Sequence, residues 1–464
     1  MYQQPWLIWQ NQETSTTRSR VYPNAVQIAI IVLASPRIGL CLEITYGNRM
    51  PTSPASKHAI TFVFITVLLD MVGFGLIIPV LPRLIESVGH LNIADATIIG
   101  GWMFFAFSAT QFVFGPLLGN LSDAHGRRPL LLLSVFGLGA DYLFSAFAPS
   151  LFWLFVGRAI AGLCGSSYVI ANAYIADITK PEDRARAFGL MGAAFGVGFV
   201  IGPAIGGLLG EFGPRVPFFA AAAISFLNLV YGYFVLPETL SAENRRPFDW
   251  ARSNPIGTFK VFQNYRGVVP LCVVLFIYFF ASSVYPAIWA FWGIAKFKWS
   301  VATIGMTLAA FGIITAAVQG GLTGWAVKRY GEHKVALIGL LTAVIAAAGY
   351  GFAPTLLVVI ILLVIHGPEG FVHPMLTAII SKNVPDDAQG ELQGGISSIM
   401  NVAMLAGTVF FSQIFGYFMQ PTAPITSPDM AYFACAVLML LALALFVAVD
   451  RKNDYAIRAA TPKT

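Results

Sequence analysis

The sequence predicts an all-α membrane protein, and three observations support this fold class. Charged residues make up 11% of the 464-residue chain and hydrophobic residues 57%, whereas charged residues form about a quarter of a typical soluble domain. From Ala59 onward, apolar runs of about 20 residues follow one another, which is the length of a helix that spans a bilayer. The runs are continuous rather than alternating, so we expect helices rather than barrel strands.

The apolar runs divide into twelve predicted spans. The first six cover residues 59–81, 98–118, 129–147, 151–173, 187–209 and 218–236. The last six cover residues 268–291, 301–325, 334–352, 355–378, 391–418 and 430–449. An even number of spans places both ends of the chain on the same side of the membrane.

Residues 1–57 differ from the rest of the chain because they are polar. Their one apolar patch, Ala29–Ala34, is too short to span, and no clean cleavage pattern follows it. The stretch Met50–Pro54 reads as a natural start just before the first span. We interpret the extension as a mis-assigned or dispensable leader, the alternative being a disordered cytoplasmic tail.

A repeat divides the spans into two halves. The spacing of Gly119 and Gly126 recurs in Gly324 and Gly331, and the acidic stretch at 181–183 recurs at 385–387 with the same shift to within one residue. The repeat predicts two parallel six-helix halves around a central cavity. We assign the halves to 58–236 and 268–450, with a cytoplasmic linker at 237–267 and a cytoplasmic tail at 451–464.

The distribution of positive charge predicts the orientation of the spans. Lys and Arg are concentrated in the loops on the side of residues 119–129, in the linker and after Asp450. The loops on the other side hold only Arg83, Arg215, Lys296 and Lys298. Because cytoplasmic loops carry excess Lys and Arg, we expect both termini and residues 119–129 in the cytoplasm.

Composition argues against several other functions. The net charge of +6 is explained by cytoplasmic loops that face anionic lipid, so we expect no nucleic-acid partner. The four cysteines are scattered, which predicts neither a disulfide framework nor a metal site, and we expect no cofactor. An enzyme would need a convergent set of reactive groups, which only the span-ten residues described below approach.

The stretch Gly119–Pro129 predicts a short charged turn between the second and third spans. Two glycines would permit the turn, the acid would suit a helix N-terminus, and the two arginines would suit helix C-termini. Such contacts could hold one conformation and break in another, and the alternative is a solvated turn. The partial copy at Gly324–Gly331 favours gating, which we assign to Gly119, Asp123, Gly126, Arg127 and Arg128.

Small residues recur at every third or fourth position of the fifth span. They give one helix face with almost no side chain, so another helix backbone can approach closely, although generic helix packing has the same pattern. The proline in this pattern adds a kink. The pattern consists of Gly189, Gly198, Gly202, Pro203, Gly206 and Gly207.

Ionisable residues inside three of the N-terminal spans predict a proton path. Asp70 lies in the middle of the first span, Asp141 in the third and Arg158 near the start of the fourth. Such groups are costly in lipid and usually face a cavity or a partner. An Asp–Arg pair that forms and breaks could act as a proton switch, the alternative being a structural ion pair.

The tenth span carries three polar residues on one helix face. His366, Glu369 and His373 are at positions i, i+3 and i+7, and prolines interrupt the helix there. We favour a cavity-facing surface for protons or substrate over helix–helix hydrogen bonding, and a metal site is the weakest interpretation. Gln111 and Gln319 could likewise contact substrate or join helices.

Four tryptophans lie near span ends on the outer side. We interpret them as interface aromatics rather than a binding cage. They are Trp102, Trp289, Trp292 and Trp299.

These motifs together resemble the tetracycline/proton antiporters of the twelve-spanner drug:proton antiporter branch of the major facilitator superfamily. The resemblance covers Met50 to Asp450 and is densest in LLDMVGFGLIIPVLP, GPLLGNLSDAHGRRPLLLLSVFGLGADYLFSAF, GRAIAGL and GFVIGPAIGGLLGEFGP. It implies the major facilitator fold and export of a drug in exchange for a proton. It also implies roles in transport for Asp70, Asp141 and Arg158, a place near the drug for Gln111, and control of conformational change by Asp123, Gly126 and Arg127.

The sequence departs from this family at three places. The turn reads Asp123–Ala124–His125–Gly126 and lacks one basic residue, the ninth span (LIGLLTAVIAAAGY) lacks the family's acid, and Thr315 stands where the family has a histidine. These departures put tetracycline itself in question but leave the proton-antiport scaffold intact. We hypothesise that Glu369, with His366 and His373, supplies the missing charge of the C-terminal half.

We therefore expect a proton-coupled antiporter that exports a drug-like amphipathic molecule, with tetracycline as one candidate, across the bacterial inner membrane by alternating access. Its partners would be the substrate, protons and the lipid bilayer, and it would act as a monomer and not as an enzyme. A proton-coupled importer of a sugar or metabolite is an alternative that the fifth-span pattern disfavours. A membrane enzyme or a sensor without transport is a further alternative.

Overall fold

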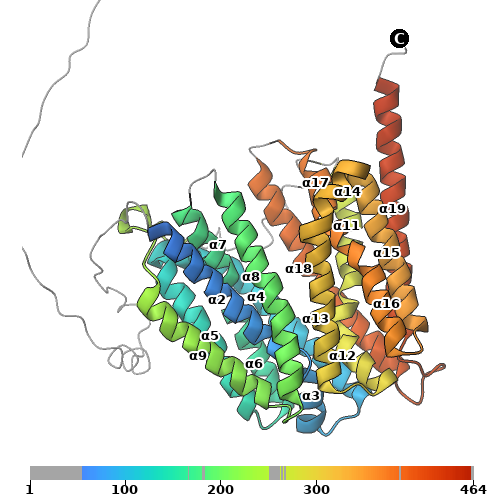
Figure 1. Cartoon of the computed structure of the whole chain (residues 1–464), viewed down its shortest axis with the longest axis horizontal. Coiled ribbons are helices and arrows are strands. Elements are labelled where there is room, and N and C mark those ends of the chain that lie inside the picture. The colour runs from blue at the N-terminus through green and yellow to red at the C-terminus, as the bar shows by residue number, and fades with distance from the viewer. Residues whose placement is uncertain are drawn as a thin grey trace, which may run out of the picture. The chain divides into compact units, whose positions relative to one another are not determined.

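The computed structural model describes residues 55–460, except 166, 180–182, 250–261, 263–264, 266–267 and 386–387. Within these residues the chain forms helices and no strand (Figure 1), which confirms the predicted fold class. The predicted extension at 1–57 lies outside the described residues up to position 54, as does much of the 237–267 linker.

The first half of the chain begins with a bent span. Helices α2 (Ala55–Ile77) and α3 (Leu81–Gly89) meet at 47°, and Pro79 between them cannot continue the backbone hydrogen bonds. The remaining helices are α4 (Ile93–His125), α5 (Arg127–Phe147), α6 (Leu151–Cys164), α7 (Ser167–Ile178), α8 (Arg184–Gly210) and α9 (Val216–Val235).

The second half contains longer breaks within its spans. Its helices are α11 (Val269–Ser282), α12 (Val284–Phe297), α13 (Val301–Ala317), α14 (Thr323–Tyr330), α15 (Glu332–Phe352), α16 (Leu356–His366), α17 (Val372–Ser381), α18 (Gln389–Phe418) and α19 (Met430–Ala460). A π-helical segment, η6 (Val318–Leu322), joins α13 to α14, and a 3-10 segment, η7 (Gly367–Phe371), joins α16 to α17. Pro368 explains the second break because it lacks a backbone N–H.

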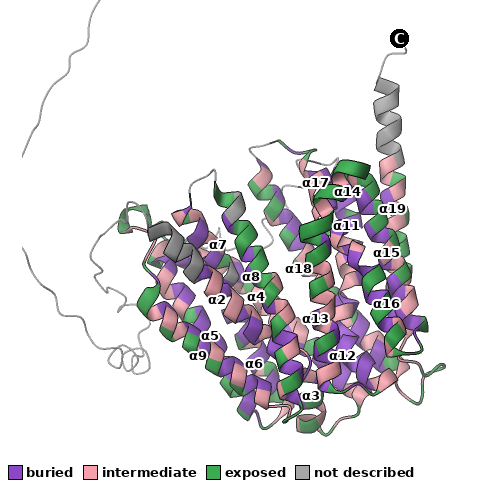
Figure 2. Cartoon of the chain, viewed as in Figure 1, coloured by how far each residue is buried: buried purple, intermediate pink, exposed green. Residues whose placement is uncertain are grey.

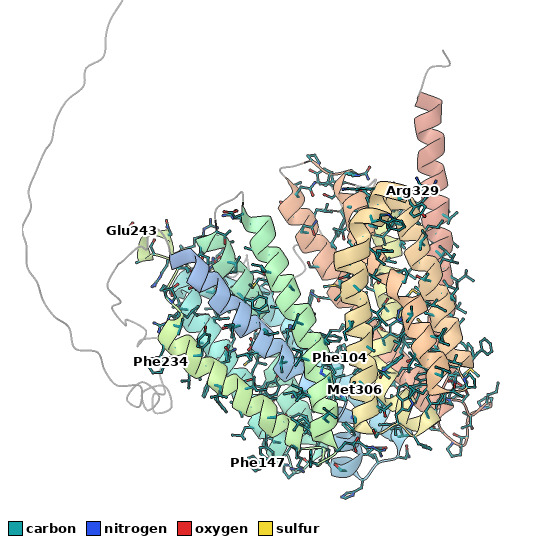
Figure 3. All side chains as sticks on the ribbon, in the orientation of Figure 1. Phe104, Phe147, Phe234, Glu243, Met306 and Arg329 are labelled. Carbon is teal, nitrogen blue, oxygen red and sulfur yellow. The ribbon has the colours of Figure 1, made fainter. Side chains whose placement is uncertain are left out.

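The described helices account for the predicted spans. Eleven helical segments are long and apolar enough to cross a bilayer, and counting the bent pair α2–α3 as one span raises the number to twelve. Large apolar side chains point outward on many of them, as Phe147 and Phe234 do at 65% and 79% exposure (Figures 2 and 3). Exposed apolar surface of this extent suits lipid rather than water.

The two sets of helices contact each other through α8 with α13 and α4 with α18. A Cβ added at Gly207, near the end of α8, would lie 2.8 Å from the backbone oxygen of Val301 at the start of α13. The end of α8 thus meets the start of α13, so the two helices run antiparallel. Gly331, which follows α14, therefore lies at the same end of the bundle as Gly126. We call this the Gly126 end, and the inter-helix contact at Gly207 lies at the opposite end.

Three of the four tryptophans contradict the prediction of interface aromatics. Trp289, Trp292 and Trp299 are buried at 5%, 0% and 5% exposure and contact one another, while only Trp102 is exposed. The indole nitrogen of Trp292 donates to Asp429, which also pairs with Lys296 at 2.8 Å. The indole nitrogen of Trp289 likewise donates to Thr307 at 3.0 Å, so partners satisfy the polar atoms of two of these buried rings. The three residues are therefore core residues of the second half.

Candidate functional site

The predicted turn at residues 119–129 is much shorter than the sequence suggested. Helix α4 continues through Gly119 to His125, and α5 begins at Arg127, so Gly126 alone connects them. Its φ of 104° and ψ of 155° form a conformation that is essentially restricted to glycine. Gly331 has nearly the same angles, 79° and 161°. The repeat between the halves therefore extends to the backbone.

Arg127 joins three helices at the Gly126 end. Its Nε donates to Asp177 on α7 at 3.0 Å, and its Nη1 donates to Ser122 on α4 at 2.8 Å. The same Nη1 forms an ion pair with Asp123, which also lies on α4. A planar guanidinium can make several such bonds at once. Asp123 and Arg127, which we predicted as gating residues, are thus in direct contact.

Glu238 is a site residue that the sequence analysis missed. Its carboxylate accepts from the backbone N–H of Arg127 at 2.9 Å and of Arg128 at 3.3 Å, at the start of α5. It therefore occupies the helix N-terminus that we had expected an acid of the turn to occupy, whereas Asp123 lies in the last turn of α4. The prediction that Asp123 lies at a helix N-terminus is therefore wrong.

The arginines do lie near helix C-termini as expected. The Nη2 of Arg128 donates at 2.6 Å to the carbonyl oxygen of Tyr233, in the last turn of α9. The start of the linker is also bound here, because the backbone N–H of Arg246 donates to the carbonyl oxygen of Asp123 at 3.1 Å. The turn is thus attached both to its own half and to the chain that leaves that half.

Asp141 and Arg158 form a buried ion pair between α5 and α6. The Nη2 of Arg158 donates to the Oδ2 of Asp141 at 2.8 Å, and the two residues are 7% and 1% exposed. Ser145 contacts both charged groups at 3.4 Å. The carboxylate and guanidinium neutralise each other in this apolar setting.

Asp70 is not part of this ion pair. It is 5% exposed on α2, and the side-chain amide of Asn228 on α9 donates to it at 3.1 Å. Ser167 on α7 is its other hydrogen-bond partner. No lysine or arginine of the described chain forms an ion pair with it, so a charged Asp70 carboxylate has only neutral partners.

Two of the three span-ten residues are in side-chain contact with each other. The Nε2 of His366 contacts the carboxylate of Glu369, and both residues are buried, at 2% and 6% exposure. The Nδ1 of His366 lies 3.2 Å from the hydroxyl of Tyr350, and Ser282 donates to Glu369 at 2.9 Å. His373 is exposed and packs against Phe279 instead.

Gln111 and Gln319 occupy equivalent places in the two halves. The Nε2 of Gln111 donates at 3.1 Å to the carbonyl oxygen of Gly165, at the break between α6 and α7. The Nε2 of Gln319 donates at 3.3 Å to that of Gly370, in the break between α16 and α17. Each amide thus bonds to an interrupted helix, and within the described part of the chain its Oε1 accepts no hydrogen bond. Thr315 also lies beside Gly370.

The glycine face of α8 contacts two different helices. Gly198, Gly202 and Gly206 pack against the backbone of α2, while Gly207 packs against α13. Pro203 lies against Gly75 of α2. A Cβ at Gly189 would meet no described atom within 4 Å. The pattern therefore forms a close helix contact everywhere except at the Gly126 end.

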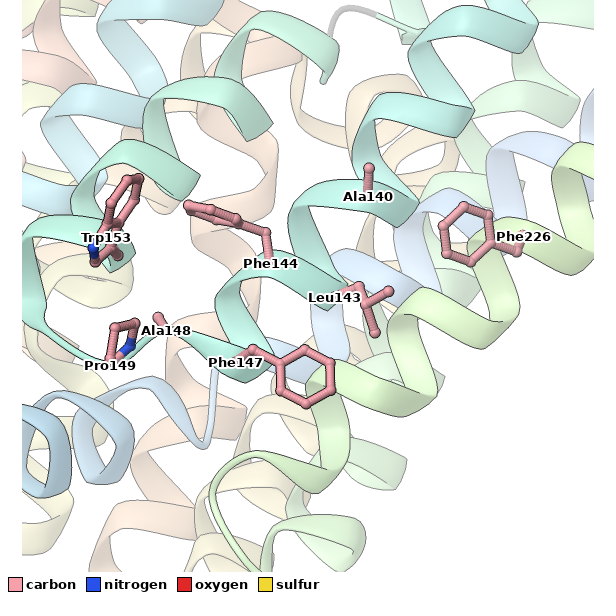
Figure 4. Close-up of a pocket in the computed structure, with 8 residues that line it drawn as sticks. All are labelled: Ala140, Leu143, Phe144, Phe147, Ala148, Pro149, Trp153 and Phe226. Carbon is pink, nitrogen blue, oxygen red and sulfur yellow. The ribbon is translucent and has the colours of Figure 1, made fainter. Parts of the chain in front are cut away.

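An apolar groove lies on the outer face beside α5, the helix that carries Asp141 (Figure 4). No ionisable side chain lines it, so we do not assign it to transport. Among the described residues, no three His, Cys, Asp or Glu side chains are grouped as metal ligands. The groove is lined by Ala140, Leu143, Phe144, Phe147, Ala148, Pro149, Trp153 and Phe226.

Comparison with known proteins agrees with this architecture. The sequence matches the Major Facilitator Superfamily over residues 63–291 and 271–463. Tetracycline resistance protein, class C, of Escherichia coli is 38% identical over 360 residues, which cover 78% of this chain and 90% of that protein. The class G protein of Vibrio anguillarum is 37% identical over 357 residues, which cover 75% and 88%.

A solved structure gives the same result for the fold. The human organic anion transporter MFSD10 has a TM-score of 0.64 and 24% identity, and the match covers 85% of this chain and 100% of that one. The chain therefore belongs to the major facilitator superfamily and, within it, to the family of the tetracycline resistance proteins.

Proposed function

We propose that this protein exports an amphipathic small molecule of the tetracycline type across the bacterial inner membrane in exchange for protons. The observation that carries the proposal is Asp70, a buried acid within a membrane span whose described partners are all neutral. An ionised carboxylate is costly at such a place, so binding and release of a proton there is coupled to access to water. The names of the relatives support tetracycline as the first substrate to test.

Contacts between the helices support an alternating-access mechanism. α8 and α13 pack closely at the opposite end, whereas Cβ atoms at Gly189, Gly192, Gly320 and Gly324 would meet no described atom within 4 Å. Closure at one end and space at the other is the arrangement of one state of such a cycle. The excess of Lys and Arg supports a cytoplasmic Gly126 end, so we assign this state as open to the cytoplasm.

The gate is the network around Gly126. Arg127 binds Asp123 and Asp177, and Glu238 binds the start of α5, so these helix ends move together or separate only when the bonds break. We assign Gly119 to the helix rather than to the turn itself. Arg128 adds a bond to α9. Reversible contacts of this kind provide two discrete states.

We assign proton coupling to Asp70, Asp141, Arg158 and Glu369, and substrate contacts to Gln111, Gln319 and His373. The free Oε1 atoms of the two glutamines and the exposed imidazole of His373 are suited to a polar edge of an amphipathic molecule. His366 was predicted as a substrate contact, but its 2% exposure and its bond to Glu369 support a role with the acid instead.

The parts of the chain have separate roles in this proposal. Residues 58–236 and 268–450 move as two six-helix bodies, joined by the 237–267 linker, with both termini in the cytoplasm. The protein works as a monomer and catalyses no covalent reaction.

Drug susceptibility tests the proposal in living cells. Expression in an efflux-deleted bacterial host should raise the tetracycline concentration that stops growth, and Asp70→Asn at equal membrane abundance should not. A wild-type protein that leaves susceptibility to tetracycline and to a panel of amphipathic drugs unchanged would contradict export.

A further inference from the structure

We propose that His366 and Glu369 form a second proton-binding site, in the C-terminal half, distinct from Asp70. The proposal deepens the proton coupling proposed above and rests on it for its role in transport. The site consists of the Glu369 carboxylate, the Nε2 of His366 that contacts it, and the Ser282 hydroxyl that donates to its other oxygen at 2.9 Å.

The surroundings of the pair contain titratable groups but no fixed positive charge. Tyr278 on α11, Tyr285 on α12, Tyr350 on α15 and Cys435 on α19 face Glu369. Within the described chain, no lysine or arginine pairs with Glu369, and Lys296 of α12 is paired with Asp429. Among the described residues no lysine or arginine balances the carboxylate, so a bound proton is suited to that role.

Charge balance gives the pair two states. With one proton, the pair is neutral overall, either as a carboxylic acid beside a neutral imidazole or as a carboxylate beside an imidazolium. Without that proton, a net negative charge remains in an apolar interior, which is strongly unfavourable until water enters. The bound proton comes from water on one side and returns to water on the other, and no other bond is formed or broken.

Aromatic rings pack against the imidazole of His366. The imidazole ring lies 4.6 Å from the ring of Tyr285 and 5.0 Å from that of Phe311, measured between centroids. The Tyr350 hydroxyl at 3.2 Å from Nδ1 fixes the ring orientation so that Nε2 points at Glu369.

The pair lies where a change of charge can act on helix geometry. Glu369 belongs to the 3-10 segment η7, and the next residue, Gly370, accepts the hydrogen bond from Gln319 in the π-helical segment η6. Irregular turns of this kind often mark functional hinges. Loss of the proton would leave a negative charge on η7 beside the Ser282 hydroxyl of α11, near the point where the eighth and tenth spans touch.

Infrared difference titration of the purified full-length protein tests the site without any substrate. On acidification, wild-type protein should gain a band of the protonated pair, from a carboxylic acid or from an imidazolium ring, that Glu369→Gln lacks. Glu243→Gln provides a matched control, because it makes the same chemical change at an exposed linker position and should keep the band. Asp70→Asn should remove a different component of the infrared difference spectrum and leave the band that depends on Glu369. Identical spectra for wild type and Glu369→Gln would overturn the proposal.

Two further variants keep the test decisive if Glu369→Gln does not fold. His366→Gln and Ser282→Ala both retain the carboxyl group but remove one of its partners, so each should change the frequency of the band. An unchanged band in both variants would contradict the proposed site. A band that persists in Glu369→Gln would contradict it equally.

The infrared test of the second site and the test of drug export can fail independently of each other. A Glu369 band in a protein that moves no protons when tetracycline is added would support the site and contradict the proposed export. Drug-driven proton movement in a protein whose infrared spectrum is the same with and without Glu369→Gln would support export and overturn the second site.

Discussion

Arg158 donates from its Nη2 to the Oδ2 of Asp141 at 2.8 Å, and both side chains are buried within the first six spans. Asp141→Asn leaves the guanidinium buried without a counter-charge. Loss of one partner of a buried ion pair typically costs about 3–5 kcal/mol. We therefore expect Asp141→Asn to lower the unfolding temperature in detergent markedly.

The double variant Asp141→Asn/Arg158→Gln serves as the control for this prediction, because it removes both charges. It should recover a large part of the lost stability, since no isolated charge remains buried. If the double variant were as unstable as Asp141→Asn alone, the pair would not be the reason for the loss.

Asp70→Asn should uncouple proton movement from substrate binding. Asparagine is similar in shape and can still hydrogen bond to Asn228, but it cannot carry a proton at this position. We expect the transport rate to fall by more than about tenfold, which corresponds to about 1.4 kcal/mol of barrier. Binding of tetracycline to the purified variant, followed by fluorescence, should remain measurable, and a rate equal to that of wild type would exclude Asp70 as the coupling acid.

Three glycine substitutions separate backbone strain from steric contact at the gate. Gly331→Ala meets no described atom within 4 Å, so only its φ of 79° opposes it, at about 1–3 kcal/mol. Gly126→Ala has φ of 104° and also a clash with Glu238, so we expect a larger loss of thermal stability. Gly119→Ala lies in a helix with only Val169 nearby, at 3.7 Å, and should be tolerated. Equal unfolding temperatures for all three variants would contradict this account.

Asp123→Asn should reduce the rate of transport more than the affinity for substrate. The substitution removes the ion pair with Arg127 on the adjacent helix but touches none of the residues assigned to substrate. Kinetics of tetracycline uptake into inside-out vesicles would separate the two effects, and Asp177→Asn offers a matched loss of the other carboxylate bound by Arg127. A rise in KM without a fall in maximal rate would place Asp123 in the binding site instead.

The sequence indicated the spans and the repeat because both depend on local patterns. Apolar length predicts a membrane helix directly, and Gly126 and Gly331 are marked by equal spacing of glycines and charges. The extent of the turn was less predictable, since Gly119 allows a turn but also fits a helix, and only φ distinguishes these outcomes. The breaks at η6 and η7 likewise depend on contacts between spans eight and ten.

Residues whose role depends on distant partners escaped prediction. Glu238 lies more than a hundred positions from Arg127, to which its carboxylate is bonded, so no local pattern pointed to it. Trp289 and Trp292 resembled interface residues because they lie near the end of a span, yet Thr307 and Asp429 satisfy their nitrogens inside the core. The pairing of His366 with Glu369 could be predicted from the sequence, because residues i and i+3 share a helix face. The contacts with Tyr350 and Ser282 could not, because these residues lie on other helices.

Drug-driven proton movement in inside-out membrane vesicles is the sharpest test of proton-coupled export. Vesicles that contain the wild-type protein are energised to an acidic interior and monitored with a pH-sensitive dye while tetracycline is added. We expect protons to leave the interior as drug enters, and Asp70→Asn vesicles with equal protein content to give no response. Tetracycline uptake that proceeds equally in vesicles without a proton gradient would contradict proton-coupled export.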